Sequence, residues 1–405
     1  MNDSYGVRHL QKHIWENHAF SHIFNADFLG FALMVIAGVA LLTFVLVYGM
    51  VAVWAERKVA GHIQDRLGPM RVGWHGWLQS LADGVKLMLK EDIIPTMADK
   101  PLFILAPPLV FLAAFTAYAV LPFSSRAQLA DLDIGVLYIT AVTSLGVVGI
   151  IMAGWASNSK WPLYGAMRSA ALVVSYGVPL GLSMLPVLML SGSLSLQEIV
   201  GNQGGGILHW NLFQALPFMP LAFLVFFISS LAETNRVPFD IAEAESELVG
   251  GYHTEYSGIN FSLFFIAEYS AMLLSCGVAA TLFLGGYLPP AFRTLGMMGL
   301  PRLLAWLALG LFLLWRFTSF WERRQFSEAL FFAVLTLAGL LLWRTFPHLF
   351  WFLTKTGVLF LVMLWLRWTL PRLRIDQMMY MCWKVLTPLA FVNLLGTSLW
   401  WMWAN

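Results

Sequence analysis

Residues 28–55 read FLGFALMVIAGVALLTFVLVYGMVAVWA, a run of 28 positions without one charged side chain. A helix needs about 20 mostly apolar residues to cross the hydrocarbon core of a bilayer. The run is long enough to span a membrane with some tilt. It is too long for a cleaved signal peptide, and Asp27 rather than a basic cluster precedes it. We therefore expect a transmembrane helix here.

The rest of the chain repeats this pattern of long apolar runs and short polar loops. Hydrophobic residues make up 59% of the 405 positions and charged residues only 11%, whereas soluble domains carry about 25% charged residues. The sequence therefore predicts an all-α fold, a polytopic bundle of transmembrane helices. About ten spans are expected, near 28–55, 102–122, 134–155, 169–191, 212–232, 259–287, 302–320, 327–345, 350–370 and 384–403.

Basic residues give the bundle an orientation. If the N-terminus lies outside, 17 of the 24 Lys and Arg residues fall on the inner side and seven on the outer side. Inner loops of membrane proteins carry an excess of Lys and Arg. The bias favours both termini outside and an even number of spans.

Four regions follow from this pattern. They are an outer or interfacial segment at 1–26, core spans at 27–290, an inserted helical hairpin at 300–346, and C-terminal spans at 347–405. The first region holds two pairs of histidines at i,i+4 spacing, which share a helical face: His9 with His13, and His18 with His22. A metal site there would need a third ligand and a general base, and neither is present, so an interfacial amphipathic or frayed segment is expected.

Charge and cysteine content exclude other classes. The net charge of +2 is too small to indicate nucleic acid as a partner. Cys276 and Cys382 lie in apolar stretches without a C-x-x-C pattern, so neither a metal site nor a disulfide framework is expected. No dinucleotide fingerprint is present.

The inner loop at 56–101 is amphipathic. From Trp74 onward, one helical face is apolar, comprising Trp74, Trp77, Leu78, Leu81, Val85, Met88 and Leu89. The opposite face carries His75, Gln79, Asp83, Lys86 and Lys90. This pattern predicts a helix in the membrane plane with tryptophans at headgroup depth. A strap that only stabilises the bundle is the alternative.

The inner loop at 233–258 begins ETNRVPFDIAEAESE and carries six carboxylates against one arginine. Crowded carboxylates at the base of a membrane helix raise one another's pKa and can exchange protons near neutral pH. The loop therefore suits the entrance of a proton path or a surface for a basic partner. A solvated charged loop is the alternative, because acidic residues contribute little to topology.

Glu268, followed by Tyr269, is the clear ionisable residue inside a span. A carboxylate in a span costs several kcal/mol unless it is partnered or hydrated, so it marks a functional site by default. The alternative is a hydrogen bond that ties helices together.

These segments resemble, in order, one membrane subunit of proton-pumping NADH:quinone oxidoreductases, called the H subunit in bacteria and subunit 1 in mitochondria. The matching blocks are Glu56 to Gly61, Arg66 to Pro69, Leu81 to Lys86, Lys90 to Asp92, Gly154 to Lys160, the whole of 232–258, Ala267 to Tyr269, Arg367, Leu370 to Arg372, Asp376 with Gln377, and Trp383 with Lys384. The likeness covers about 50–290 and 350–395.

The resemblance implies a role in a respiratory complex I of the bacterial inner membrane. Residues shaping a quinone channel would be Glu56, Arg57, Arg66 and Arg71. A coupling loop would comprise Glu233, Arg236, Asp240, Glu243, Glu245 and Glu247, and an intramembrane proton relay would continue through Glu268 and Tyr269. The chain itself would hold no catalytic residue, metal or cofactor. Quinone would be the substrate, and FMN and iron–sulfur clusters would belong to soluble peripheral-arm subunits. Small and antiporter-like membrane subunits and lipid would be its neighbours.

The chain also departs from the family pattern. Leu172 and Gly177 stand where a glutamine and a glutamate are usual in the fourth span, Met70 replaces an asparagine, and Ala242 a proline. Either water carries protons across the gap at Gly177 or coupling follows another route. The hairpin at 302–345 has no family counterpart.

Two other functions compete with this interpretation. An equivalent subunit of a ferredoxin-dependent complex or of a membrane-bound hydrogenase is the nearer alternative. A stand-alone transporter would need inverted repeats and broken helices around a midplane site, and the sequence indicates neither. Apolar tunnel walls suit both ubiquinone and menaquinone.

Overall fold

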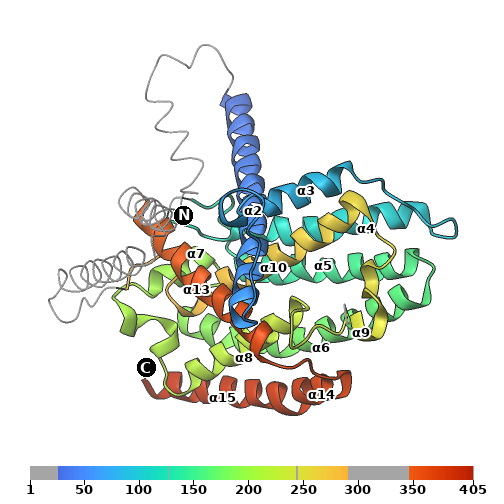
Figure 1. Cartoon of the computed structure of the whole chain (residues 1–405). Coiled ribbons are helices and arrows are strands. Elements are labelled where there is room, and N and C mark those ends of the chain that lie inside the picture. Colours follow the sequence, from blue (N-terminus) through green and yellow to red (C-terminus); the bar gives the residue numbers. More distant parts are fainter. Residues whose placement is uncertain (1–25, 126, 243–244, 291–345, 405) are drawn as a thin grey trace, which may run out of the picture.

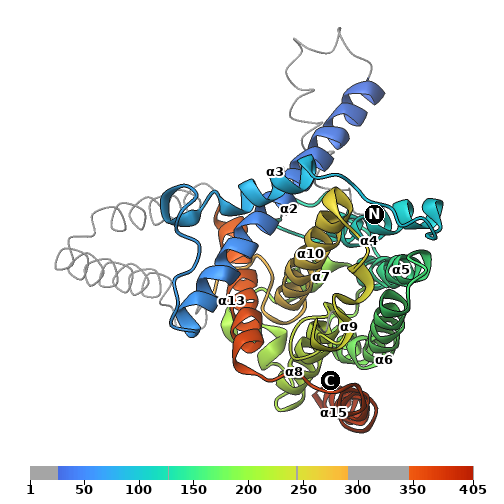
Figure 2. The ribbon, with the colours of Figure 1, turned by 45° about the vertical axis from the view of Figure 1, so that its right-hand side comes forward.

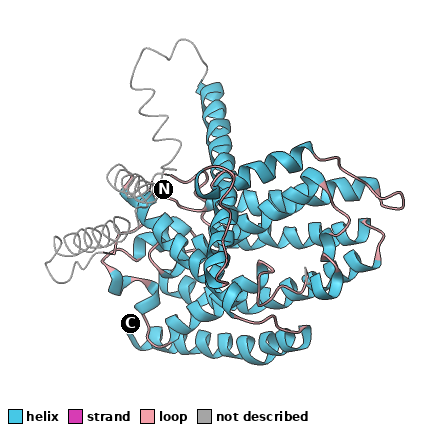
Figure 3. Ribbon diagram, viewed as in Figure 1, coloured by secondary structure: helices cyan, strands magenta, loops and turns pink. Residues whose placement is uncertain are grey.

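The computed structural model describes residues 26–125, 127–242, 245–290 and 346–404. All regular elements of these residues are helical (Figures 1 and 3). The α-helices are α2 (Ala26–Ile63), α3 (Gln79–Leu89), α4 (Lys100–Ala117), α5 (Gly135–Ala156), α6 (Lys160–Ser191), α7 (Leu196–Asn202), α8 (Phe218–Glu233), α9 (Glu245–Leu248), α10 (Gly258–Phe283), α13 (Pro347–Thr369), α14 (Ile375–Tyr380) and α15 (Thr387–Ala404). Short 3-10 turns lie at Trp74–Gly76, Tyr118–Val120, Ile207–His209, Asn211–Phe213 and Gly251–His253, and a π-helical turn at Met381–Leu386 joins α14 to α15.

Seven helices in the described residues are long and apolar enough to cross a membrane, and α8 is a shorter apolar helix. The polytopic all-α fold is therefore confirmed. Eight expected spans have a helical counterpart among these elements. The spans expected at 302–320 and 327–345, with the hairpin at 300–346, lie outside the described residues, as does the segment at 1–25.

Three expected boundaries were wrong. Helix α2 continues past residue 55 to Ile63, so Glu56 lies on a helix and not in a loop. Helix α6 begins at Lys160, nine residues before the expected span, because the stretch from Trp161 to Met167 is itself mostly apolar and packs partly in the interior. Helix α8 begins only at Phe218. The preceding turn is held elsewhere, since the Asn211 amide donates to the Leu282 carbonyl at 2.7 Å.

The expected in-plane helix is α3, which is shorter than the amphipathic stretch that begins at Trp74. It begins at Gln79, because a 3-10 turn at Trp74–Gly76 precedes it and both Gly73 and Gly76 have positive φ. A side chain at Gly76 would also collide with the Pro69 backbone. The two tryptophans therefore precede the helix, although they share its exposure, since Trp77 and Met88 expose 57% and 70% of their surface.

Helix α10 lies at the centre of the bundle. Of the residues in its most apolar 18-residue stretch, 67% are buried inside the protein, against 17% for the corresponding stretch of α2. It contacts α2 and α13 on one side and α4 on the other (Figure 2). Helix α2 crosses the bundle at a steep angle, and its N-terminal part projects beyond the other helices (Figure 1).

The segments expected inside meet at one face of the bundle. The Ile93 N–H donates to the Ser257 hydroxyl at 2.9 Å, joining the 56–101 loop to the 233–258 loop. The Asp99 N–H donates to the Ala156 carbonyl at 3.0 Å, joining the first loop to the end of α5.

The segments expected outside meet at the opposite face. The Lys355 ammonium of α13 donates to three carbonyls that follow α10, those of Leu284, Gly286 and Leu288, at 2.6–2.9 Å. It also lies 4.3 Å from the Trp210 ring centroid, a favourable cation–π distance. These bonds fix the outer ends of α10 and α13 against each other.

Candidate functional site

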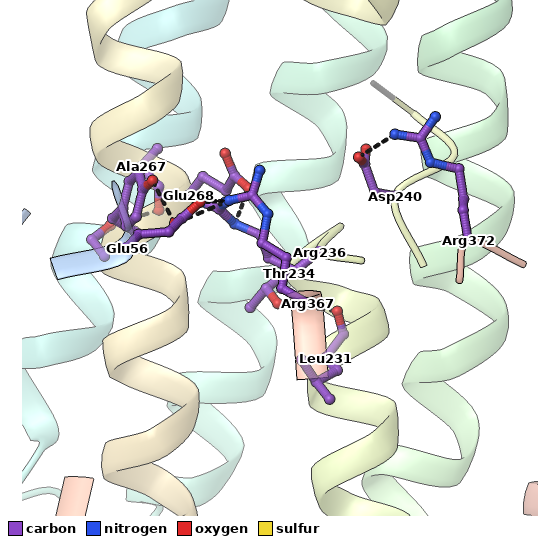
Figure 4. Close-up of polar contacts among 11 residues, drawn as sticks. Glu56, Leu231, Thr234, Arg236, Asp240, Ala267, Glu268, Arg367 and Arg372 are labelled. Atoms are coloured by element: carbon purple, nitrogen blue, oxygen red, sulfur yellow. Dashed lines mark hydrogen bonds and ion pairs between the residues drawn. The ribbon is translucent and has the colours of Figure 1, made fainter. Parts of the chain in front are cut away.

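Glu56 lies at the centre of a buried ion network where α2, α10 and α13 meet (Figure 4). Only 6% of the surface of Glu56 is exposed. One carboxylate oxygen pairs with Arg367 of α13. The other accepts a 2.7 Å hydrogen bond from the Tyr269 hydroxyl and lies 3.4 Å from Nη1 of Arg236. Burial of a carboxylate is costly unless it is paired and hydrogen-bonded, and Glu56 meets both conditions.

Arg236 connects Glu56 to Glu268. It follows α8, is 5% exposed, and pairs through Nε with Glu268 of α10. Its guanidinium carbon lies 4.4 Å from the Tyr269 ring centroid, which adds a cation–π contact. The network thus contains two carboxylates and two guanidinium groups, so it is neutral as a whole. Removing one member of such a buried set leaves an uncompensated charge and costs about 3–5 kcal/mol.

The 233–258 loop is tied to its neighbours on two sides. Arg372, between α13 and α14, pairs with Asp240 at 2.9 Å (Figure 4), and the next residue donates its N–H to the Pro238 carbonyl at 3.1 Å. On the α6 side, Arg168 pairs with Glu247 at 2.7 Å. The loop is therefore clamped between α6 and the link from α13 to α14.

A partly open cavity of about 90 Å³ adjoins the network. Its walls come from α4, α5, α10 and the 233–258 loop, and α6 contributes only Val173. Its polar lining includes Thr143, Glu233, Asn235 and Glu268. The lining is mostly apolar, but a cavity of this size has room for several water molecules beside these polar groups.

Glu268 belongs to both features. It pairs with Arg236 in the network, and it lines the cavity together with Glu233. Thr143 of α5 lines the same cavity, and its hydroxyl donates to the Thr140 carbonyl at 3.3 Å. Glu233 and Glu268 thus face the same cavity, and of these two carboxylates Glu268 also belongs to the ion network.

The expected quinone-channel residues do not gather in one place. Glu56 is in the network, whereas Arg57 pairs with Asp83 of α3 at 2.6 Å. Partial burial raises the pKa of Asp83, but hydrogen bonds from Arg57 and Gln79, with the charges of Arg57 and Lys86, hold it below its usual value. The remaining two, Arg66 and Arg71, are exposed in the segment before α3.

The expected coupling residues divide similarly. Glu233 lines the cavity, and Arg236 belongs to the ion network. Asp240 and Glu247 form the ion pairs that hold the loop on its two sides. Glu245 begins α9, and Glu243 lies outside the described residues.

Three contributing residues were not among the expected site residues. They are Arg367, Arg372 and, in the cavity lining, Thr143. The sequence offers a signal for the first two, since Arg367 and Arg372 flank the end of an apolar span on the inner side. Thr143 has none, because a threonine in an apolar helix ordinarily bonds to its own backbone.

Gly177 itself does not line the cavity. Gly177 is on the exposed face of α6, and a side chain there would meet nothing within 4 Å. Leu172, by contrast, is buried at 3% exposure. Gly177 lies one helical turn after Val173, which lines the cavity that Glu233 and Glu268 share.

Comparison with known proteins identifies the family. Residues 36–398 match the family model described as NADH dehydrogenase. The H subunit of NADH-quinone oxidoreductase from Chlorobaculum tepidum is 44% identical over 380 residues, 93% of this chain and 94% of the relative. The chain belongs to this family. The H subunit numbered 1 from Solibacter usitatus is 45% identical over 361 residues, 85% of this chain and 90% of the relative. The H subunit numbered 2 from Geobacter metallireducens is 41% identical over 386 residues, 90% and 94%.

Membership of this family of H subunits confirms the resemblance seen in the sequence. The chain is a multi-pass membrane component of a multi-subunit oxidoreductase whose substrate is quinone. Its relatives are bacterial.

Proposed function

We propose that this chain walls a quinone channel of a complex I-type enzyme and couples quinone reduction to proton translocation. The observation that carries the proposal is the double position of Glu268. It pairs with Arg236 beside Glu56, and it lines the cavity that also contains Glu233. A change of charge at the inner face can therefore reach the cavity through a single side chain.

Electrostatics supplies the coupling force. Two unit charges 4 Å apart interact by about 4 kcal/mol at an effective dielectric constant of 20. A negative charge that forms on quinone near Glu56 disturbs the balance of the four charged groups. Protonation of Glu268 restores balance, and the proton can then pass to Glu233 through the cavity. The coupling loop at 233–258 responds to the same change of charge, because Arg236 belongs to the loop and to the ion network.

The neighbours that we propose for this chain are arranged around the face where its inner loops meet. Soluble peripheral-arm subunits, which would carry FMN and iron–sulfur clusters, dock on the inner loops beside Arg66 and Arg71. The apolar side of α3 faces lipid and the isoprenoid tail of the entering quinone, because Met88 and Leu89 are exposed there. Small and antiporter-like subunits lie beyond the cavity. The bacterial inner membrane is the proposed location.

The test uses the intact complex in sealed vesicles. We expect Glu268→Gln and Glu233→Gln each to lower quinone reduction and proton uptake at least about tenfold, since a proton carrier is lost. Electron transfer from NADH to hexaammineruthenium, which bypasses quinone, should stay unchanged and reports assembly. Glu198→Gln is the matched control, because Glu198 is an exposed carboxylate on α7 at the opposite face. Normal proton uptake in both cavity variants would refute the coupling role.

The electron donor is tested by composition. NADH as donor is proposed because the relatives are named NADH-quinone oxidoreductase subunits. Soluble flavin and iron–sulfur subunits should co-purify from native membranes. A nickel-bearing partner would instead establish the membrane-bound hydrogenase. A complex that is reduced by ferredoxin but not by NADH would establish the ferredoxin-dependent enzyme.

A further inference from the structure

Helix α15 buries a polar amide in the middle of its span. Ala390, Asn393 and Thr397 recur at helical spacing, and each is at most 1% exposed. They lie on the side of α15 that packs against α6 and α8 (Figure 1). In the part of the chain that the structure describes, neither Oδ1 nor Nδ2 of Asn393 has a hydrogen-bond partner. Nearly all buried polar atoms in proteins have one, and ordered water is the usual partner where no protein group is in reach.

Hydroxyl groups on the neighbouring turns do not serve this amide. Thr397, one turn further along α15, donates its hydroxyl to the carbonyl of Asn393 at 2.9 Å. Ser229 of α8 has no partner among the described residues either, but it lies too far inward. The Phe218 ring lies against Gly396, and α8 runs opposite to α15. At about 1.5 Å per residue, Ser229 is therefore about 12 Å nearer to the inner face than Asn393.

Helix α6 contains two backbone carbonyls that lack their usual donor. Pro179 and Pro186 lie inside this helix, and a proline has no N–H for the carbonyl four residues earlier. The carbonyls concerned are those of Ser175 and Leu182. The first accepts a bond from the Cys382 thiol at 3.1 Å. The segment that leads into α15 thus supplies the missing donor at the first of the two positions.

The second carbonyl lies close to the level of Asn393. Helices α6 and α15 both run from the inner to the outer face. Counted from the contact of Ser175 with Cys382, Leu182 is about 10 Å further along α6, and Asn393 is about 16 Å further along its own helix. Helical carbonyls point toward the C-terminus and side chains tilt toward the N-terminus. Both directions reduce the difference of about 6 Å.

Water is the ligand whose chemistry fits this place. The amide needs an acceptor for Nδ2 and a donor for Oδ1, and the Leu182 carbonyl needs a donor. A cation would leave Nδ2 without an acceptor, and an anion would leave both oxygens without a donor. Residues 387–404 of α15 also contain no charged side chain that could bind an ion. Water both donates and accepts.

We propose that Asn393 holds an ordered water molecule that also donates to the Leu182 carbonyl, so that a buried water site joins α15 to α6. The water then takes the place of a direct hydrogen bond between the two helices. The inference does not depend on the proposed quinone channel or on proton translocation.

The test begins with the intact, unaltered complex. A cryo-electron microscopy map that shows ordered waters should place one within hydrogen-bond distance of both the Asn393 amide and the Leu182 carbonyl. A map with no water beside the amide, or with a direct bond from Nδ2 to a backbone carbonyl, would overturn the proposal.

Asn393→Leu gives a second result, in which the sign of the change decides. Leucine has nearly the same size and no polar atom. If the water joins the helices, its loss leaves the Leu182 carbonyl without a partner, and the complex should unfold a few degrees lower. If there is no such water, the variant only removes an unpaired amide. The complex would then unfold at the same temperature or higher, which would contradict the proposal.

Pro186→Ala separates the water from packing. Alanine restores an N–H for the Leu182 carbonyl, so Asn393→Leu should no longer lower the unfolding temperature in this background. A loss as large as before would mean that packing is the cause, and would overturn the bond to Leu182. Ser398→Ala is the matched control. It removes another hydroxyl or amide-type polar group of α15, one that bonds to the Leu395 carbonyl at 2.8 Å, and it should unfold as the unaltered protein does.

Discussion

The Tyr269 hydroxyl donates a 2.7 Å hydrogen bond to Glu56, 213 positions earlier in the chain. The bond joins α10 to α2, and the same tyrosine ring contacts Arg236. Tyr269 thus contacts both a carboxylate and a guanidinium group of the network.

Tyr269→Phe keeps the ring contact and removes only the hydroxyl. A hydrogen bond to a charged group contributes about 1.5–3 kcal/mol, so quinone reduction should fall several-fold while the complex stays assembled. Steady-state rates with a soluble quinone measure this effect. Tyr164→Phe, an exposed position on α6, is the control. Equal rates in the two variants would contradict a role for the hydroxyl.

Arg236→Gln should destabilise the protein by about 3–5 kcal/mol, because it leaves Glu56 and Glu268 with one arginine fewer between them. The double variant with Glu268→Gln restores the charge balance and should recover much of that loss. Thermal unfolding of the detergent-solubilised complex gives both values. A double variant less stable than Arg236→Gln alone would show that charge balance is not the cause.

The pair of Asp240 with Arg372 should behave as a unit. Asp240→Asn and Arg372→Gln should each increase protease cleavage within 233–258, because one clamp of the loop is lost. The double variant should be no worse than either single variant, since both remove the same interaction. Additive effects would mean that the two residues act independently.

Glu245 and Glu247 test the acidic loop itself. The Glu247 side chain is 54% exposed in its pair with Arg168, and exposed pairs contribute at most about 1 kcal/mol. Glu247→Gln should therefore leave stability unchanged, and Glu245→Gln and Glu247→Gln should lower pumping or quinone reduction. Unchanged rates in both single variants and the double variant would remove these carboxylates from the mechanism.

The pair of Arg57 with Asp83 predicts a dependence on acid. The folded-state pKa of Asp83 lies below its usual value, so the ionised form is favoured in the native state. The resulting stability is present above the unfolded-state pKa and is lost as pH falls through the folded-state pKa. Protease cleavage around α3 should rise on acidification below about pH 4. Asp83→Asn should show this cleavage already at neutral pH and lose the pH dependence.

The sequence predicted the spans well where apolar length alone decides them. Residues 135–156 and 347–369 are examples, since each is a long apolar run with a polar limit. Boundaries failed where backbone partners decide them. The start of α3 depends on the positive φ of Gly73 and Gly76, and the start of α8 on the bonds of Asn211. Such partners lie far apart in sequence.

The candidate site was predictable as a set of residues but not as an arrangement. Glu56, Arg236 and Glu268 stand out as charges beside or within apolar runs, and family motifs contain them. Their pairing depends on how α2, α10 and α13 cross, which no local pattern encodes. Thr143 was missed for a related reason. Its place in the cavity lining depends on how α5 packs beside Glu233, 90 positions later, and nothing in the α5 sequence distinguishes it from Thr140.

The Lys355 ammonium, with its three carbonyl partners, has a consequence for how the protein can move. It pins α13 to the outer end of α10, and the contacts of Glu56 with Arg367 and Tyr269 pin the two helices again, near the middle of α10 and the inner end of α13. Helices fastened at two levels do not slide or tilt independently. The central bundle is then a stationary scaffold, and the moving parts during turnover are confined to rotating side chains, shifting protons and the clamped loop at its inner surface.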